Sequence, residues 1–191
     1  LRAGKVAVSR LAKVERFLAG SMRVLDVGSG GGEFAYLLKK LGHDVHGIEP
    51  NRGYGDYAVR QYGIGVTLGF AGDVPLEETA FDLITIWHVL EHTEDPAEVL
   101  RQLRCALRPD GVVVIEVPNV EATCQSPRST FHEAHLYNFN LASLEAMCSK
   151  AGLQPQWRTV SDDGGNITIG CRRAPMAQPA VAAAIPGNHD R

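Results

Sequence analysis

A glycine-rich segment that directly follows a short apolar run constrains the fold of this chain more than any other feature. Residues 22–27 are mainly apolar, four of the next five positions (28, 30, 31 and 32) are glycine, and a helical pattern begins near Glu33. Glycine tolerates positive φ and has no Cβ, so the backbone of such a turn can approach a ligand closely. The helix that follows adds unpaired N–H groups and the positive end of its dipole. The segment therefore predicts a strand, a ligand-binding turn and a helix.

A second apolar stretch, about twenty residues further along the chain, ends in a carboxylate. Residues 45–48 are typical of a buried strand, and Glu49 follows them directly. In a doubly wound α/β sheet this position carries the acid that binds ribose hydroxyls. Together the two segments predict a site for a ligand that contains a nucleoside.

The rest of the sequence alternates between strand and helix patterns, which is typical of an α/β fold with a largely parallel sheet. We expect strands over residues 22–27, 45–48, 65–68, 81–86, 112–117, 153–160 and 166–171, and helices over 6–19, 32–41, 55–62, 96–107 and 141–151. Residues 108–111 carry a turn signal. Residues 161–165 have hairpin chemistry, so the last two strands should be antiparallel. The long loop over residues 118–138 is expected to be functional or disordered.

Length and composition indicate one soluble domain. The 191 residues are 45% hydrophobic and 21% charged, with a formal net charge of −3, which gives no electrostatic reason to expect nucleic acid or an anionic membrane as a partner. No apolar run is long enough to span a bilayer. Four scattered cysteines favour a reduced, cytoplasmic protein. We expect a single domain over residues 1–173, with its first helix within 1–19, and a disordered tail over 174–191. The oligomeric state and the question of whether residues precede Leu1 both stay open.

The chain resembles the class I S-adenosylmethionine-dependent methyltransferases, most closely their small UbiG-like and methyltransferase-23-like members. The resemblance covers roughly residues 20–172 and rests on a set of motifs that occur in the expected order. These motifs are Val24-Leu25-Asp26-Val27-Gly28-Ser29-Gly30-Gly31-Gly32, Gly47-Ile48-Glu49-Pro50, Gly72-Asp73, Phe81-Asp82-Leu83-Ile84, Val89-Leu90-Glu91-His92, Leu107-Arg108-Pro109-Asp110-Gly111-Val112 and His135-Leu136-Tyr137. Each motif is weak alone, and the ordered set is specific.

This resemblance implies both a fold and an activity. The fold is a Rossmann-like α/β sandwich of three layers (αβα), with seven strands in the order 3-2-1-4-5-7-6 and the last strand antiparallel. The activity is transfer of a methyl group from S-adenosylmethionine to a small molecule, with oxygen slightly favoured as the acceptor atom and S-adenosylhomocysteine as the product.

The resemblance also implies which residues hold the cofactor. Asp26 would accept from the methionine ammonium, Glu49 from the two ribose hydroxyls, and Asp73 from the adenine amino group, with the Val74 N–H facing the ring. Phe34, Ile48 or Trp87 would flank the adenine. The implied cofactor set is Asp26, Gly28, Ser29, Gly30, Gly32, Phe34, Glu49, Pro50, Asp73, Val74, Trp87 and His88. Alternatively, Asp73 caps a turn and Glu49 is a solvated strand end.

The acceptor side is expected to use histidine, because its pKa range suits a general base. His135 is the first candidate, with Tyr137 and Asn138 as substrate contacts, and His92 is the second; both histidines are also compatible with a structural role. His88, His92, His132 and His135, with Glu91 and Glu133, are an alternative metal-binding set. They lie on separate segments without a compact ligand signature, so we expect no metal.

Two other functions remain open. A nicotinamide dinucleotide enzyme would need G-x-G-x-x-G/A after the first strand, and from Gly28 the third position falls on Glu33. From Gly30 the pattern fits through Ala35, two residues late, but Glu33 and Asp26 would then repel the pyrophosphate. The other alternative is a non-catalytic chain of the same fold that binds the cofactor or a partner.

Overall fold

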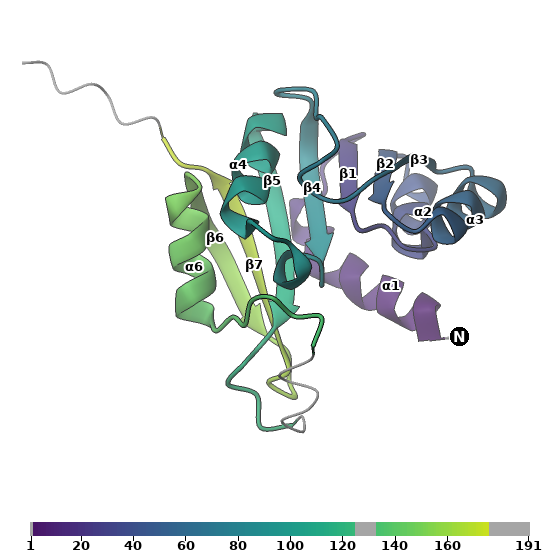
Figure 1. The fold of residues 1–191 in the computed structure, drawn as a ribbon. Coiled ribbons are helices and arrows are strands. Elements are labelled where there is room, and N and C mark those ends of the chain that lie inside the picture. Colours follow the sequence, from purple (N-terminus) through teal and green to yellow (C-terminus); the bar gives the residue numbers. More distant parts are fainter. Residues whose placement is uncertain (1, 125–132, 176–191) are drawn as a thin grey trace, which may run out of the picture.

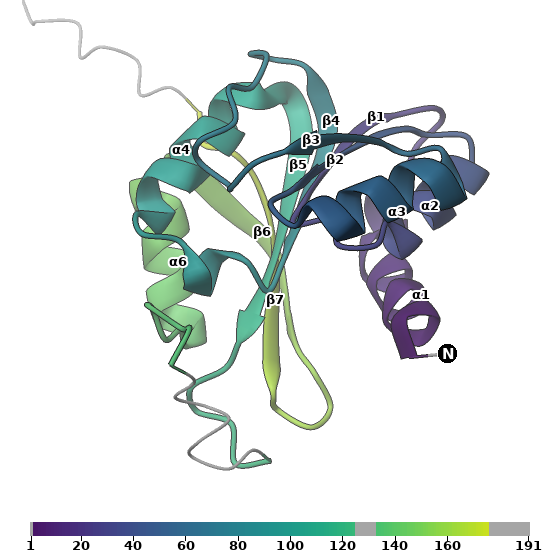
Figure 2. The ribbon, with the colours of Figure 1, turned by 45° about the vertical axis from the view of Figure 1, so that its right-hand side comes forward.

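The computed structural model describes residues 2–124 and 133–175 and shows a seven-stranded sheet between two layers of helices (Figure 1, Figure 2). The strands are β1 (Arg23–Val27), β2 (Asp44–Glu49), β3 (Gly65–Leu68), β4 (Phe81–Trp87), β5 (Leu107–Pro118), β6 (Leu153–Val160) and β7 (Asn166–Arg173). Their spatial order is β3-β2-β1-β4-β5-β7-β6, and β7 runs antiparallel to both of its neighbours. The predicted fold class and strand order are confirmed.

The helices bury one layer of the core on each face of the sheet. On one face lie α1 (Arg2–Val14), the 3₁₀ turn η1 (Glu15–Phe17), α2 (Glu33–Lys40) and α3 (Arg52–Tyr62), which pack on a cluster that includes Val24, Leu83 and Trp87. On the other face lie α4 (Pro96–Ala106) and α6 (Leu141–Lys150), which pack on a cluster that includes Leu25 and Ile84. A 3₁₀ turn, η2 (Leu90–His92), follows β4.

Side-chain caps fix where several helices begin. Asn51 accepts from the Tyr54 N–H at the start of α3, and Asp95 caps α4 in the same way, directly before Pro96. Asn140 starts α6 with a capping box. Because these caps set the helices on the sheet, they also position the loops at the carboxyl ends of the strands.

Residues 108–111, predicted as a turn between a helix and a strand, lie instead inside β5. Phe81 pairs with Leu107 and Leu83 pairs with Val112, so the chain makes its bend as a bulge opposite Asp82. The Arg108 guanidinium donates to both Asp82 carboxylate oxygens at 2.7 and 2.8 Å, which holds the bulge in place.

The first helix also differs from the sequence expectation, because it begins at Arg2 and gives way to η1 at Glu15. Part of the long loop and most of the predicted tail (residues 125–132 and 176–191) lie outside the described residues. Within the described part, none of the helices has the length and apolar content needed to cross a membrane. The four cysteines are free.

Candidate functional site

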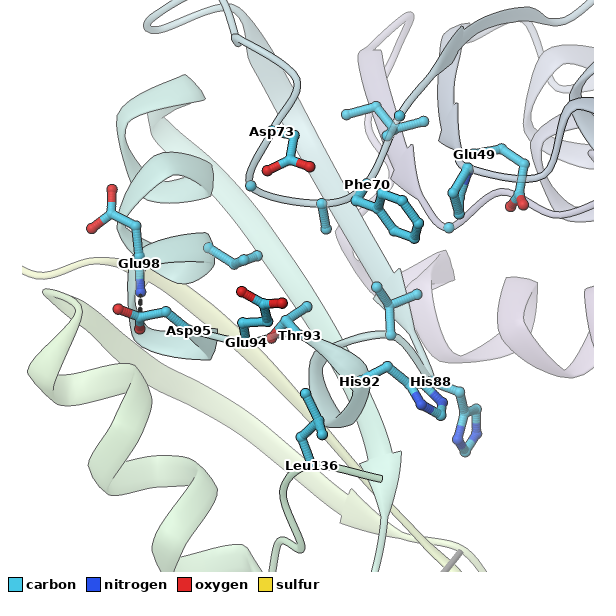
Figure 3. Close-up of a pocket in the computed structure, with 18 of the residues that line it drawn as sticks. Glu49, Phe70, Asp73, His88, His92, Thr93, Glu94, Asp95, Glu98 and Leu136 are labelled. Carbon is cyan, nitrogen blue, oxygen red and sulfur yellow. Dashed lines mark hydrogen bonds between the residues drawn. The ribbon is translucent and has the colours of Figure 1, made fainter. Parts of the chain in front are cut away.

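The sheet changes winding direction at β1, which lies between β2 and β4. In open α/β sheets ligands bind beyond the carboxyl ends of the strands at this point. A cavity of about 870 Å³ opens there (Figure 3). The ends of β1, β2 and β4, the loop after β3 and the start of α4 line it, with Gly28, Ile48, Glu49, Pro50, Phe70, Asp73, Trp87, His88, Val89, His92, Glu98 and Leu136 among the lining residues.

The glycine-rich turn between β1 and α2 is closed on one side and open on the other. Gly28, Gly30 and Gly32 have φ values of 73°, 55° and 84°, which glycine adopts without strain. A Cβ on Gly28 would lie 2.2 Å from the Val89 Cγ2 atom, whereas a Cβ on Gly30 would meet nothing within 4 Å. The backbone at Gly30 is therefore accessible to a ligand.

Glu49 lies at the end of β2, directly beside this turn. Its Oε2 atom accepts from the Gly30 N–H at 2.8 Å and its Oε1 atom from the Asn51 N–H at 2.9 Å, and the residue is 6% exposed. An ionised carboxylate offers about four acceptor positions, so each oxygen can accept one further hydrogen bond. The carboxylate is thus fixed at the cavity wall with capacity for two hydroxyl donors.

Asp26 is a fully buried carboxylate beneath the turn. Its Oδ1 atom accepts from the Thr85 hydroxyl at 2.7 Å, and its Oδ2 atom has no hydrogen-bond partner among the described residues. Burial raises the pKa of Asp26 to about 6, and Glu49 acts in the same direction, while Thr85 and Arg10 oppose the shift. Such a group favours a nearby cation, because an unpaired buried carboxylate is costly.

Arg10 is a residue of this site that the sequence analysis did not identify. It projects from α1 into a second cavity of about 450 Å³ between α1 and the glycine turn. Its guanidinium lies 5.3 Å from the centre of the Trp87 ring, and its buried Nε has no hydrogen-bond partner in the part of the chain that is described. Burial lowers the pKa of Arg10, against the opposing charges of Asp26, Glu116 and Glu33. The available sequence signal was a basic residue in the first predicted helix, over residues 6–19.

Phe34 belongs to this second cavity and not to the large one. Its ring packs edge-on against Trp87, with centroids 5.5 Å apart, and both side chains are buried in the core. Trp87 lines the large cavity, so it remains available as an adenine contact, whereas Phe34 supports it from behind.

The loop after β3 supplies a flat apolar surface that sequence reasoning missed. Phe70 is 66% exposed and lines the large cavity opposite His88 and His92 (Figure 3). Asp73 lies on the same wall, and its N–H donates to the Phe70 carbonyl at 3.1 Å. Val74 does not line this cavity, although it lines two neighbouring ones. The signal in the sequence was a lone aromatic residue between glycines.

His92 lines the opposite wall of the large cavity, and its ring contacts that of His135, which is not among the lining residues. Their ring centroids lie 4.9 Å apart, and His92 Nδ1 lies 2.8 Å from the Ala134 carbonyl oxygen. A carbonyl can only accept, so Nδ1 carries a hydrogen and the neutral ring keeps its lone pair on Nε2. The backbone N–H groups of Leu136 and Tyr137 donate to the Glu91 carbonyl, which docks this segment on η2.

Tyr137 and Asn138, the expected substrate contacts, do not line the large cavity. The Tyr137 hydroxyl donates to the Glu94 carbonyl at 3.1 Å and its ring stacks on Phe139, while Asn138 is exposed. His132 lies outside the described residues.

Glu91, His92 and His135 each place one side-chain N or O atom within 4.8 Å of the others, a closer grouping than the sequence spacing indicated. Glu133 is described and exposed and takes no part in this group. The expectation that no metal binds stays a prediction.

The glycine turn is poorly suited to a pyrophosphate. The Gly28 and Ser29 N–H groups both donate to the Ile48 carbonyl, at 2.8 and 3.0 Å, and the Gly30 N–H donates to Glu49. Glu33 places a further negative charge in the first turn of α2. Dinucleotide binding would need these N–H groups for the phosphates, whereas an adenosyl amino acid with a cationic ammonium suits the acidic surroundings.

Comparison with known proteins gives a consistent result. A family described as a methyltransferase domain matches residues 4–156. The ubiquinone biosynthesis O-methyltransferases of Haemophilus ducreyi and Bordetella avium are 33% and 36% identical to this chain, over 51% and 53% of it and 45% and 46% of their own lengths. The chain thus spans about half the length of these curated relatives. A crystal structure from Thermotoga maritima, described as an S-adenosylmethionine-dependent methyltransferase and possible histamine N-methyltransferase, superposes with a TM-score of 0.70 at 21% identity, covering 87% of this chain and 89% of that one.

Proposed function

The chain belongs to the methyltransferase domain family, within the class I S-adenosylmethionine-dependent methyltransferases, and from this premise we propose that it methylates a hydroxyl oxygen of a small-molecule acceptor. The observation that carries the proposal is the open glycine turn, which lines the second cavity at Gly30 and whose Gly30 N–H is bonded to Glu49 in the wall of the large cavity. A backbone free of side chains next to a fixed carboxylate suits an adenosyl ligand.

The residues of the site match the parts of S-adenosylmethionine one by one. Asp26 is the partner for the ammonium group, because its Oδ2 atom is buried and has no hydrogen-bond partner among the residues described. Arg10, across the glycine turn, is the partner for the carboxylate. Glu49 accepts from the ribose hydroxyls, while Phe70 packs on the adenine and Asp73 accepts from its amino group. Charge-assisted hydrogen bonds of this kind are the stronger ones.

The bound cofactor supplies an electrophilic methyl group on a sulfonium, and the protein has to position an acceptor and manage its proton. His92 is suited to that second task, because the Ala134 carbonyl holds its Nδ1–H and leaves Nε2 as a proton acceptor. We assign His135, whose ring contacts that of His92, to orienting the acceptor or assisting the proton transfer. Much of the rate enhancement would then come from proximity and orientation.

Oxygen is favoured as the acceptor atom for two reasons. A hydroxyl has to lose a proton during methylation, and the site offers a histidine base. The curated relatives are named O-methyltransferases, although each matches over about half of its length. The two reasons support a hydroxyl acceptor over an amine.

The cofactor site is tested by calorimetric titration with S-adenosylhomocysteine. Glu49→Gln removes the charge that fixes the ribose. The affinity of this variant for S-adenosylhomocysteine should therefore fall by about tenfold to one-hundred-fold, as expected for a charged hydrogen bond. Asp44→Asn, at the exposed start of the same strand, is the matched control and should bind like the wild type. A Glu49→Gln variant with wild-type affinity would remove Glu49 from the site.

The acceptor atom is tested with radiolabelled S-adenosylmethionine and two panels of small molecules, one of phenols and other acidic hydroxyls and one of primary and secondary amines. Label transfer to the hydroxyl panel is expected. Transfer only to amines would refute the oxygen proposal, and tight cofactor binding without transfer to either panel would favour the non-catalytic alternative.

A further inference from the structure

A chain of alternating charges runs through the wall of the site from α1 to η2. Lys13 of α1 forms an ion pair with Glu116 of β5. The Oε1 atom of Glu116 lies 3.3 Å from His88 Nε2, and His88 Nδ1 lies 3.4 Å from Glu91 Oε1. The Glu116 Oε2 atom also accepts from the Thr168 hydroxyl at 2.6 Å. The four ionisable groups alternate between basic and acidic, and each carboxylate is almost completely buried.

The two carboxylates beside the His88 ring favour its charged form. Each ring nitrogen lies within 3.4 Å of a carboxylate oxygen, at ion-pair distance, and both Glu91 oxygens lack a hydrogen-bond partner among the described residues. Burial opposes a charge on the ring, but Glu116 and Glu91 raise the pKa of His88 to about 9, so the ring is an imidazolium at neutral pH. A neutral ring would turn one lone pair toward a buried negative charge.

The backbone holds His88 in this bridging position. Its φ is 54°, in the left-handed region that residues other than glycine rarely adopt, and its N–H donates to the Glu116 carbonyl at 2.9 Å. Such a conformation costs free energy and persists where the surrounding structure enforces it.

The two ends of the charge chain lie at the two halves of the proposed site. On one side, α1 carries Lys13 and also Arg10, the expected partner of the cofactor carboxylate. On the other side, the Glu91 backbone carbonyl accepts from Leu136 and Tyr137 in the segment that carries His135. The His88 ring thus connects α1, which carries the expected partner of the cofactor carboxylate, to η2 and the segment that carries His135, which we call the acceptor wall.

We propose that His88 is a positioning residue whose imidazolium, held between Glu91 and Glu116, fixes the acceptor wall relative to helix α1. This assignment rests on the proposed methyltransferase function and changes the expected role of His88 from cofactor contact to structural bridge. The charged or titratable groups that face the ring or its two carboxylates are Lys13 and Arg10 from α1, Glu116 from β5, and Glu91 and His92 from η2.

Nitrogen-detected NMR of the ligand-free protein at neutral pH tests the bridge directly. The His88 ring should show two protonated nitrogens, and assignment should come from the loss of those signals in His88→Asn. A neutral His88 tautomer would overturn the proposal. Because no cofactor is present, this measurement is independent of whether the methyltransferase function holds.

Amide hydrogen exchange tests the link between the two halves. Asparagine tolerates the left-handed backbone but carries no charge, so His88→Asn should keep the turn and lose the bridge. Exchange should accelerate at least tenfold in α1 and in residues 134–138, and stay unchanged in β6 and β7. Glu116→Gln should produce the same pattern, and the double variant should add little, because both changes break one network. Unchanged exchange in α1 or in residues 134–138 would overturn the inference.

Kinetics separates positioning from general loss of structure. In His88→Asn and in Glu116→Gln, kcat should fall at least tenfold, and any loss of affinity for S-adenosylhomocysteine should be equal in the two variants, because both loosen α1 in the same way. His46→Asn, on β2, where its ring bonds to the Thr67 hydroxyl, is the control and should retain wild-type kcat. A loss of cofactor affinity in His88→Asn that Glu116→Gln does not share would mean that His88 contacts the cofactor. If the wild-type protein binds no S-adenosylhomocysteine, the proposed function fails while the NMR and exchange results still stand.

Discussion

Asp26 shows how a single residue can favour binding at the expense of stability. Its carboxylate is fully buried, and burial raises its pKa from 3.8 to about 6. Between these two values the folded state holds a proton that the unfolded state has lost. Protonation of Asp26 therefore stabilises the folded state fully below pH 3.8, and this contribution is lost as the pH rises through about 6. The free energy of unfolding changes by about 3 kcal/mol across this range.

Asp26→Asn tests this trade-off, because the amide oxygen can still accept from Thr85 while the charge disappears. At pH 8 the variant should be more stable than the wild type by up to about 3 kcal/mol, and at pH 4 the difference should shrink, as measured by urea denaturation. Its affinity for S-adenosylhomocysteine should fall at least tenfold, since the ammonium loses its charged partner. Equal stabilities at both pH values would contradict the buried, ionised Asp26.

Single residues differ in how clearly their role can be predicted from sequence. The positions of Glu49 at a strand end and of the glycines in a turn were predictable, because a strand end and a positive φ are local properties of the chain. The places of Arg10 and Phe70 in the site were not predictable, because they depend on residues that are distant in sequence. Arg10 of α1 lies across a cavity from the glycine turn, and Phe70 lines the large cavity. Phe34 was expected to flank the adenine because it follows the glycines, but its ring packs against Trp87 in the core instead.

At the scale of elements, the strands were predicted more accurately than the helix ends. The expected third strand matches β3 residue for residue, and β6 matches as well, because alternating or continuous apolar runs end at clear turn signals. The turn signal over residues 108–111 was misplaced, since pairing with β4 continues on both sides of the bulge. Local sequence shows that the chain bends there but not that its neighbours keep pairing.

The pairing of η2 with the segment after the long loop yields a prediction about catalysis. His92 and His135 come from these two elements, and their rings are in contact. With the best acceptor from the panels, His135→Ala and His92→Ala should each lower kcat at least tenfold while cofactor affinity is kept, because general-base catalysis contributes about 10²–10⁴-fold. The double variant should lose less than the product of the two effects. Full activity of His135→Ala would reduce that residue to a scaffold role, and additive losses would mean that the two rings act separately.

At the scale of the whole molecule, the site draws on one part of the sheet and leaves the other as support. The cavity is lined from β1, β2, β4, the loop after β3 and the start of α4, whereas β6 and β7 contribute none of its lining residues. The strand order that creates the winding change was predictable from the ordered motifs. The way α1 closes over the glycine turn was not, because it depends on packing between segments that are distant in sequence.

Cofactor binding should therefore stabilise the molecule unevenly. At a concentration of S-adenosylhomocysteine of one hundred times its Kd, mass action adds about 2.7 kcal/mol of stability. For a chain of this size that corresponds to a rise in Tm of about 5–10 °C. Protection from amide exchange below the global unfolding limit should increase in α1, the glycine turn, residues 69–73 and η2, and hardly at all in the β6–β7 hairpin. NADH at the same concentration is the control and should leave Tm unchanged, because the acidic turn repels its pyrophosphate. A larger shift with NADH, or protection centred on β6 and β7, would place the ligand elsewhere than at the winding change of the sheet.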